Sequence, residues 1–190
     1  MAHLILHPLE GLEVAGRGRL DFGCRKEAAL SLLGEPCSSN DHAFYYETLD
    51  CHVYFDAQGI VDFFDIPEGP FLQSGNSVEI YGQDPFSLHA DGLYTLLARH
   101  NGTAKITGDA PYSYRFCGIN TAIWRETYED EIRQMMAEYP HEAELLALEL
   151  PKGNNYWSIG IGSVLTVTAK SPNAACPKRR KGRLKMRFLF

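Results

Sequence analysis

Residues 44–66, FYYETLDCHVYFDAQGIVDFFDI, form the densest run of strand-forming residues in the chain. Phe, Tyr, Val and Ile favour strands because their side chains fit a pleated, half-buried surface. The segment DAQG at 56–59 divides this run, and Gly59 can adopt the positive φ that a tight turn requires. The sequence therefore predicts a β-hairpin here.

Side chains alternate between the two faces of each predicted hairpin strand. On the first strand, Cys51 and Phe55 share one face and His52 lies on the other. On the second strand, the adjacent Phe63 and Phe64 point to opposite faces, so both faces are expected to be partly covered. We therefore expect a helix or a second sheet to pack against this hairpin.

The rest of the chain predicts an α+β fold, with antiparallel sheet or sheets and helices packed on one face. Residues 8–16 are expected to be a loop, Ser87 to cap the second helix, and residues 151–155 to form a turn. In the last predicted strand, Tyr156 falls on the polar face and Ile159 on the buried face. The expected helices cover residues 25–33, 88–100 and 126–150, the last interrupted at Pro140, and further strands cover residues 4–6, 77–81, 112–116, 119–124 and 156–170.

The order helix, polar turn and Tyr-rich strand occurs twice along the chain. This predicts a single α+β domain over residues 1–173, with possible similar halves at 16–70 and 77–170. Composition changes abruptly after residue 173, and residues 174–190 form a basic tail. We expect this tail to be disordered or foreign to the native chain, and the alternative is that it binds nucleic acid.

The net charge of −6 conceals an uneven distribution. The tail holds 7 of the 18 Lys and Arg residues and no acid, so residues 1–173 carry 11 basic and 24 acidic groups, a net charge of −13. Such a body repels nucleic acid and anionic membranes and attracts a basic partner. With neither an apolar run of membrane-spanning length nor a signal-like amino terminus, the expected location is the cytoplasm.

Catalytic and metal-binding patterns are weak. Cys51 and His52 are adjacent in a predicted strand, so they point to opposite faces and cannot act together. The five cysteines are not closely paired, and no spacing typical of a metal site or a nucleotide loop is present. We expect no cofactor, no metal and no enzymatic activity. The alternative is a small hydrolase or ligand-binding domain with Cys51, His52 or Cys117 in a pocket between helix and sheet.

Acidic clusters are the remaining candidate surface. One group lines the predicted hairpin and a second covers the region 126–150, and exposed tyrosines in both could anchor a protein contact. The alternative is simply a solvated charged surface. The candidate partner-binding residues are Tyr54, Asp56, Asp62, Asp65 and Glu68 in the first group, and Glu126, Tyr128, Glu129, Asp130 and Glu131 in the second.

The segments LDFG at 20–23 and LGEP at 33–36 flank the first predicted helix and precede the Tyr-rich strand and hairpin. This arrangement resembles the helix-plus-sheet repeats of β-lactamase-inhibitor protein and BamE-type lipoproteins. It is also similar to immunity proteins encoded beside polymorphic or contact-dependent toxins. The resemblance covers about residues 16–66, with a fainter echo over 77–125.

The resemblance implies an α+β scaffold that binds another protein without catalysis. Combined with the acidic body, it leads us to expect a cytoplasmic immunity protein that blocks a cognate basic toxin domain, such as a nuclease. Neither a membrane nor nucleic acid is expected to bind the acidic body. A monomer and a homodimer that pairs hairpin edges both remain open.

Overall fold

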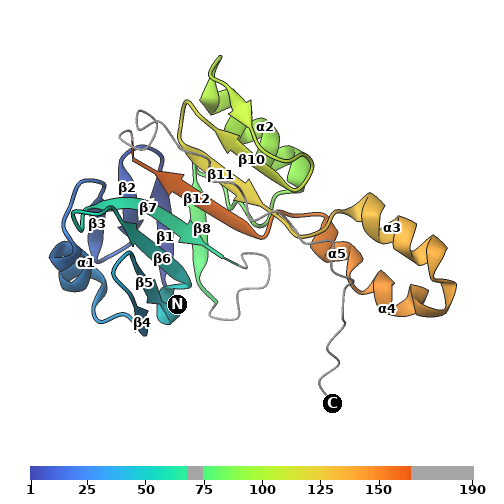
Figure 1. Cartoon of the computed structure of the whole chain (residues 1–190), viewed down its shortest axis with the longest axis horizontal. Coiled ribbons are helices and arrows are strands. Elements are labelled where there is room, and N and C mark those ends of the chain that lie inside the picture. The colour runs from blue at the N-terminus through green and yellow to red at the C-terminus, as the bar shows by residue number, and fades with distance from the viewer. Residues whose placement is uncertain (68–74, 164–190) are drawn as a thin grey trace.

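The computed structural model describes residues 1–67 and 75–163 and places their strands in two sheets (Figure 1). The large sheet contains β4 (Ser38–Ser39), β5 (Ala43–Tyr46), β6 (Cys51–Phe55), β7 (Val61–Ile66), β9 (Ile106–Thr107), β10 (Ser113–Phe116), β11 (Thr121–Trp124) and β12 (Ser158–Gly162). The small sheet contains β1 (His3–His7), β2 (Gly11–Val14), β3 (Gly18–Asp21) and β8 (Ser77–Ile80). The α-helices are α1 (Lys26–Leu33), α2 (Ala90–Asn101), α3 (Glu129–Glu138), α4 (Ala143–Ala147) and α5 (Leu150–Gly153), and short 3-10 turns cover η1 (Glu47–Leu49) and η3 (Pro140–Glu142).

The large sheet is antiparallel throughout, with strand order β4-β5-β6-β7-β12-β11-β10-β9. The small sheet has order β3-β2-β1-β8, and its β1 and β8 run parallel. Helices combined with mainly antiparallel sheets confirm the α+β fold. Within the described residues, no helix has the length and apolar character needed to cross a bilayer.

The predicted hairpin is formed by β6 and β7, and the turn between them is held by Asp56. Its carboxylate accepts hydrogen bonds from the backbone N–H groups of Gln58 (2.8 Å) and Ile60 (2.9 Å). Gly59 adopts φ +75°, a conformation that glycine takes without steric penalty. Local turn chemistry therefore fixes the register of these two strands.

The hydrophobic core lies between the two sheets and extends beneath α1 and α2. Leu4 and Leu12 of the small sheet belong to the same buried cluster as Phe64 of the large sheet. Leu93 and Leu97 of α2 are fully buried in that cluster as well. Each such side chain contributes about 1.5–3 kcal/mol through removal of apolar surface from water.

The large sheet is built from two similar sets of elements. In one set α1 is followed by β4 to β7, and in the other α2 is followed by β9 to β12. The sets meet where β7 pairs with β12, with Asp65 opposite Gly160 and Phe64 opposite Ile161. The proposed relationship between residues 16–70 and 77–170 stays a prediction.

Two local predictions were wrong. Residues 11–14 form strand β2 and not part of a loop, because Gly11 lets the neighbouring backbone approach: a Cβ there would lie 2.3 Å from the carbonyl oxygen of Leu20. The N-cap of α2 is His89, whose Nδ1 accepts from the N–H of Asp91. Ser87 instead donates its hydroxyl to the carbonyl of Asp84.

Two further predictions failed near the carboxyl end of the described residues. Residues 150–153 form α5, because proline is tolerated in the first turn of a helix. Tyr156 is buried, since its ring packs against the Arg125 guanidinium and the ring of Tyr114. The predicted continuation of β12 to residue 170, and the basic tail at 174–190, lie outside the described residues.

Helices α3 to α5 form a helical arm that projects beyond the sheets (Figure 1). Arg125 secures the base of this arm: its Nε donates to the Pro111 carbonyl and its Nη1 to the Gly153 carbonyl, both at 3.0 Å. The guanidinium also lies over the rings of Tyr128 and Tyr156, at 5.7 and 4.8 Å from their centroids. A single buried cation therefore ties the arm to the large sheet.

Candidate functional site: the outer face of the large sheet

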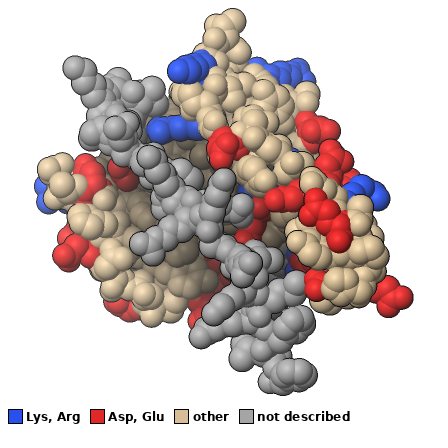
Figure 2. Space-filling model, turned by 45° about the vertical axis from the view of Figure 1, so that its right-hand side comes forward, with Lys and Arg blue, Asp and Glu red and all other residues tan. Residues whose placement is uncertain are grey.

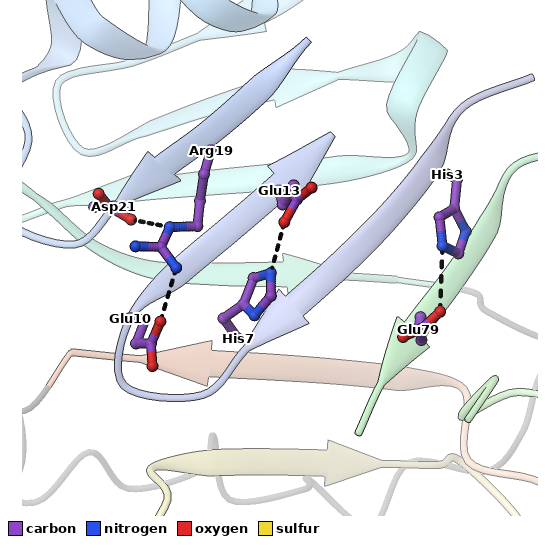
Figure 3. A network of polar contacts seen from close by, with 7 residues as sticks. All are labelled: His3, His7, Glu10, Glu13, Arg19, Asp21 and Glu79. Atoms are coloured by element: carbon purple, nitrogen blue, oxygen red, sulfur yellow. Dashed lines mark hydrogen bonds and ion pairs between the residues drawn. The ribbon is translucent and has the colours of Figure 1, made fainter. Parts of the chain in front are cut away.

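Each sheet has one face turned away from the core, and the two outer faces differ in chemistry. The small sheet presents a network of polar side chains that contact one another in pairs (Figure 3). In each exposed pair the two side chains bind one another, and the surface that they form is hydrophilic. The paired groups are His3 with Glu79 (3.3 Å), His7 with Glu13 (3.0 Å), and Arg19 with both Glu10 (2.8 Å) and Asp21 (2.5 Å).

The outer face of the large sheet instead carries a row of side chains from successive strands. None of these residues belongs to the core cluster. Because cross-strand partners lie side by side, the row is continuous across the sheet. From one edge to the other it contains Tyr45, His52, Asp65, Gly160, Ala122, Arg115 and Thr107.

Aromatic side chains dominate the part of this face that comes from β5 to β7. The ring of Tyr45 stacks on His52, with 4.5 Å between centroids. The ring of Tyr54 lies 5.9 Å from His52 and 5.9 Å from Phe63. We call Tyr45, His52, Tyr54 and Phe63 the aromatic band; its contacts hold large, rigid rings on a face outside the core.

A hollow of about 190 Å³ opens beside the aromatic band. Small residues form its floor, and the ring of Phe63 lies across one of them: a Cβ on Gly160 would lie 2.4 Å from Phe63 Cζ. On the far side, Trp124 is 43% exposed and its ring meets the edge of Trp157. We call this site the sheet hollow and define it by Phe63, Asp65, Arg115, Ala122, Trp124 and Gly160.

Asp65 supplies the carboxylate of the sheet hollow. No residue in the described part of the chain forms a hydrogen bond or ion pair with this carboxylate, and burial raises its pKa to about 6. Beside it, His52 has a buried Nδ1 that also has no partner among residues 1–67 and 75–163, and burial lowers the pKa of this imidazole. A neutral imidazole next to an unpaired carboxylate leaves the site able to accept a positive charge.

Arg115 lies at the opposite end of the sheet hollow from Asp65. Its Nε and Nη2 both donate to the side-chain carbonyl oxygen of Asn120, at 3.3 and 2.8 Å. The Asn120 amide donates in turn to the carbonyl of Ser163. The guanidinium is therefore held at the β10 side of the hollow.

The candidate nucleophiles are not assembled into a catalytic site. Cys51 is fully buried in the core, where burial and then the nearby Asp65 and Asp50 raise the pKa of its thiol far above its usual value. His52 lies on the opposite face of the same strand. Cys117 is half-buried beside the Arg115 carbonyl. Among the described residues, no group of three His, Cys, Asp or Glu side chains could hold a metal ion.

The first group of predicted partner-binding residues divides between two environments. Tyr54 and Asp65 lie on the outer face of the large sheet, whereas Asp56 caps the hairpin turn. Asp62 is half-buried, and burial together with Asp56 raises its pKa. Glu68 lies outside the described residues.

The second predicted group lies at the start of the helical arm. Tyr128 packs on Arg125 and Tyr112, Glu129 pairs with Arg133, and Glu131 accepts from the Thr127 hydroxyl, so these three have partners within the chain. Glu126 and Asp130 are exposed. Figure 2 shows that acidic side chains are spread over the drawn face, with few Lys or Arg among them.

Sequence reasoning missed Arg115, Trp124 and Gly160 as parts of one site. Alternation along residues 112–124 places Arg115 and Trp124 on one face once the hairpin register is known. The pairing of β7 with β12 brings this face beside Asp65, and no local signal in the sequence specifies that pairing. No family model matches the chain, and neither a curated protein nor a solved structure shows significant similarity to it.

Proposed function

We propose that the chain is a cytoplasmic immunity protein that binds a basic toxin domain, such as a nuclease, through the outer face of the large sheet. The observation that carries the proposal is the contrast between the two outer faces. The small sheet's polar side chains contact one another, while the large sheet presents aromatic rings and the Asp65 carboxylate, which has no hydrogen-bond or ion-pair partner among the described residues. Of these rings Trp124 is exposed and those of the aromatic band are half-buried, and aromatic side chains of this kind are enriched at protein-binding surfaces.

Charge supports a basic partner. Residues 1–173 carry a net charge of −13 from 11 basic and 24 acidic groups, which accelerates encounter with a cationic protein. Inhibition by occlusion needs no catalytic group on this chain. The acidic side chains would occupy the region where a nuclease receives its substrate phosphates.

The alternative, a small hydrolase or ligand-binding domain, has less support. Cys51 and His52 lie on opposite sides of the large sheet and cannot converge. The sheet hollow, at about 190 Å³, is also smaller than the roughly 300–1,000 Å³ of typical small-molecule sites. A hollow of this size fits one side chain of a protein partner better than a substrate.

The test is co-purification with the product of the neighbouring gene, followed by affinity measurement on matched variants. Tyr54→Ala and Trp124→Ala should each weaken the complex at least tenfold, because they remove rings from the outer face of the large sheet. The control variants His7→Ala and Glu13→Ala alter the outer face of the small sheet and should leave affinity unchanged. Failure to bind that product or any other basic protein would refute the proposal.

A further inference from the structure

The sheet hollow brings together two aromatic side chains and a carboxylate that has no partner within residues 1–67 and 75–163. Asp65 and the rings of Phe63 and Trp124 line the same hollow, whose floor is made by Gly160 and Ala122. The ring of Phe63 cannot move down toward the sheet, since it already lies against Gly160. A group that enters must therefore meet aromatic surface at its sides and a carboxylate at one end.

We propose that the sheet hollow is the anchor site for one arginine side chain of the bound partner, with Asp65 receiving its guanidinium. This inference rests on the proposed function, because it names the group by which a basic partner is recognised. A guanidinium is planar, stacks on aromatic rings and can donate two parallel hydrogen bonds to a carboxylate. The more strongly hydrated ammonium of lysine gains less from such a site.

The neighbouring charged groups are compatible with an incoming cation. On β6, His52 stacks on Tyr45 and is neutral above its lowered pKa. On β10, Arg115 is separated from Asp65 by β12 and β11, and three strand spacings place the two backbones about 14 Å apart. The guanidinium of Arg115 is held by Asn120 and does not pair with Asp65.

The experiment uses the full chain and two small probes, N-acetyl-arginine amide and its neutral isostere N-acetyl-citrulline amide. Two-dimensional NMR follows the Gly160 amide and the Trp124 indole N–H during titration. The arginine probe should shift both signals in a saturable manner, whereas the citrulline probe should not. Equal shifts from both probes, or none from either, would overturn the inference.

Two variants make the result specific to the hollow. Asp65→Asn keeps the shape of the side chain but removes its charge, and should reduce affinity for the arginine probe at least tenfold. Ala122→Leu fills the floor from the outer face and should abolish binding while the core signals stay unchanged. Undiminished probe binding in both variants would contradict the assignment.

The dependence on pH gives a third readout. Only ionised Asp65 accepts the cation, so affinity should be constant well above pH 6 and fall by up to tenfold per pH unit below it. Asp65→Asn should remove this dependence. A pH-independent affinity in the wild-type chain would count against Asp65 as the acceptor.

Two further comparisons distinguish the occupant and the function. One full-length variant carries Gln at the seven Lys and Arg positions of the tail, and it should bind the arginine probe as the wild type does. If only this variant bound the probe, the chain's own tail would be the occupant of the hollow, and the inference would be overturned.

In the complex with the neighbouring gene's product, Asp65→Asn should weaken binding. A complex that forms normally with Asp65→Asn would refute the anchor site while leaving the proposed function intact.

Discussion

At the scale of single residues, the ionised Asp65 carboxylate lowers the free energy of unfolding, because its site is partly buried. Its pKa rises from 3.8 to about 6 on folding because burial disfavours the charged form. A raised carboxyl pKa means that the native state binds the proton more tightly than the unfolded state does. The penalty is therefore absent below about pH 4, grows between pH 4 and 6, and is complete above pH 6.

Asp65→Asn should consequently stabilise the protein at pH 7.5. The raised pKa of Asp65 corresponds to at most about 3 kcal/mol of stability, and the gain should vanish near pH 4. Urea unfolding of both proteins at pH 7.5 and pH 4 checks this. Loss of stability at pH 7.5 would mean that Asp65 has a stabilising partner. A cost in stability at Asp65 would fit the trade-off between stability and function, because we propose that this residue receives a group of the partner.

Gly160 is the second residue on which the shape of the sheet hollow depends, because the ring of Phe63 packs against it. Gly160→Ala would place a Cβ 2.4 Å from Phe63 Cζ, which forces the ring or the strand to move. We expect a loss of about 1–3 kcal/mol in the free energy of unfolding, as for other overpacked sites.

Gly92→Ala serves as the matched control for that change. Gly92 lies within α2, is exposed, and its added Cβ would meet nothing closer than 3.9 Å. Alanine should therefore stabilise the protein by about 0.5–1 kcal/mol, through helix propensity alone. Chemical denaturation of the two variants should give changes of opposite sign, and equal effects would show that the Phe63 contact is unimportant.

At the scale of elements, the helical arm depends on Arg125. The buried guanidinium donates to two backbone carbonyls that lie on either side of the arm's base and packs on two tyrosine rings. A buried carbonyl that loses such a partner costs about 1–3 kcal/mol.

Arg125→Lys should therefore destabilise the protein by about 2 kcal/mol and increase proteolytic cleavage within residues 126–153. The control is Arg133→Lys on the exposed face of α3, where the ion pair with Glu129 contributes about 0.3–0.5 kcal/mol. Thermal unfolding and limited proteolysis measure both effects. Similar behaviour of the two variants would exclude the role assigned to Arg125.

The elements also show which features a sequence can predict. The β6–β7 hairpin was predicted because Asp56 and Gly59 are local turn signals, and the buried face of β6 followed from alternation. Strand β2 was missed because Gly11 resembles a loop marker until the close approach of Leu20 is seen.

The candidate site was only partly predictable. Tyr54 and Asp65 were selected as acidic and aromatic surface residues, but the hollow depends on β7 pairing with β12, two strands far apart in the chain. Hydrophobic patterning indicates which faces of the two strands are covered, yet it does not specify which strand lies beside which. The composition of the outer face therefore becomes clear only once the order of the strands in the large sheet is known.

At the scale of the whole molecule, the outer faces of the two sheets differ in how their polar side chains are paired. The polar side chains of the small sheet contact one another in pairs, and several acids of the helical arm are bonded to groups within the chain. The large sheet's face carries aromatic rings together with His52 Nδ1 and the Asp65 carboxylate, neither of which has a hydrogen-bond partner in the described part of the chain. Its binding to a basic partner should also weaken with salt, because long-range charge attraction is screened.

Backbone amide hydrogen exchange, measured with and without the neighbouring gene's product, tests most directly whether the partner binds the large sheet and not the small one. The account predicts that binding slows exchange along β6, β7, β11 and β12, where the aromatic band and the sheet hollow lie, and leaves β1 to β3 unchanged. Slowed exchange on the small sheet with none on the large sheet would contradict it.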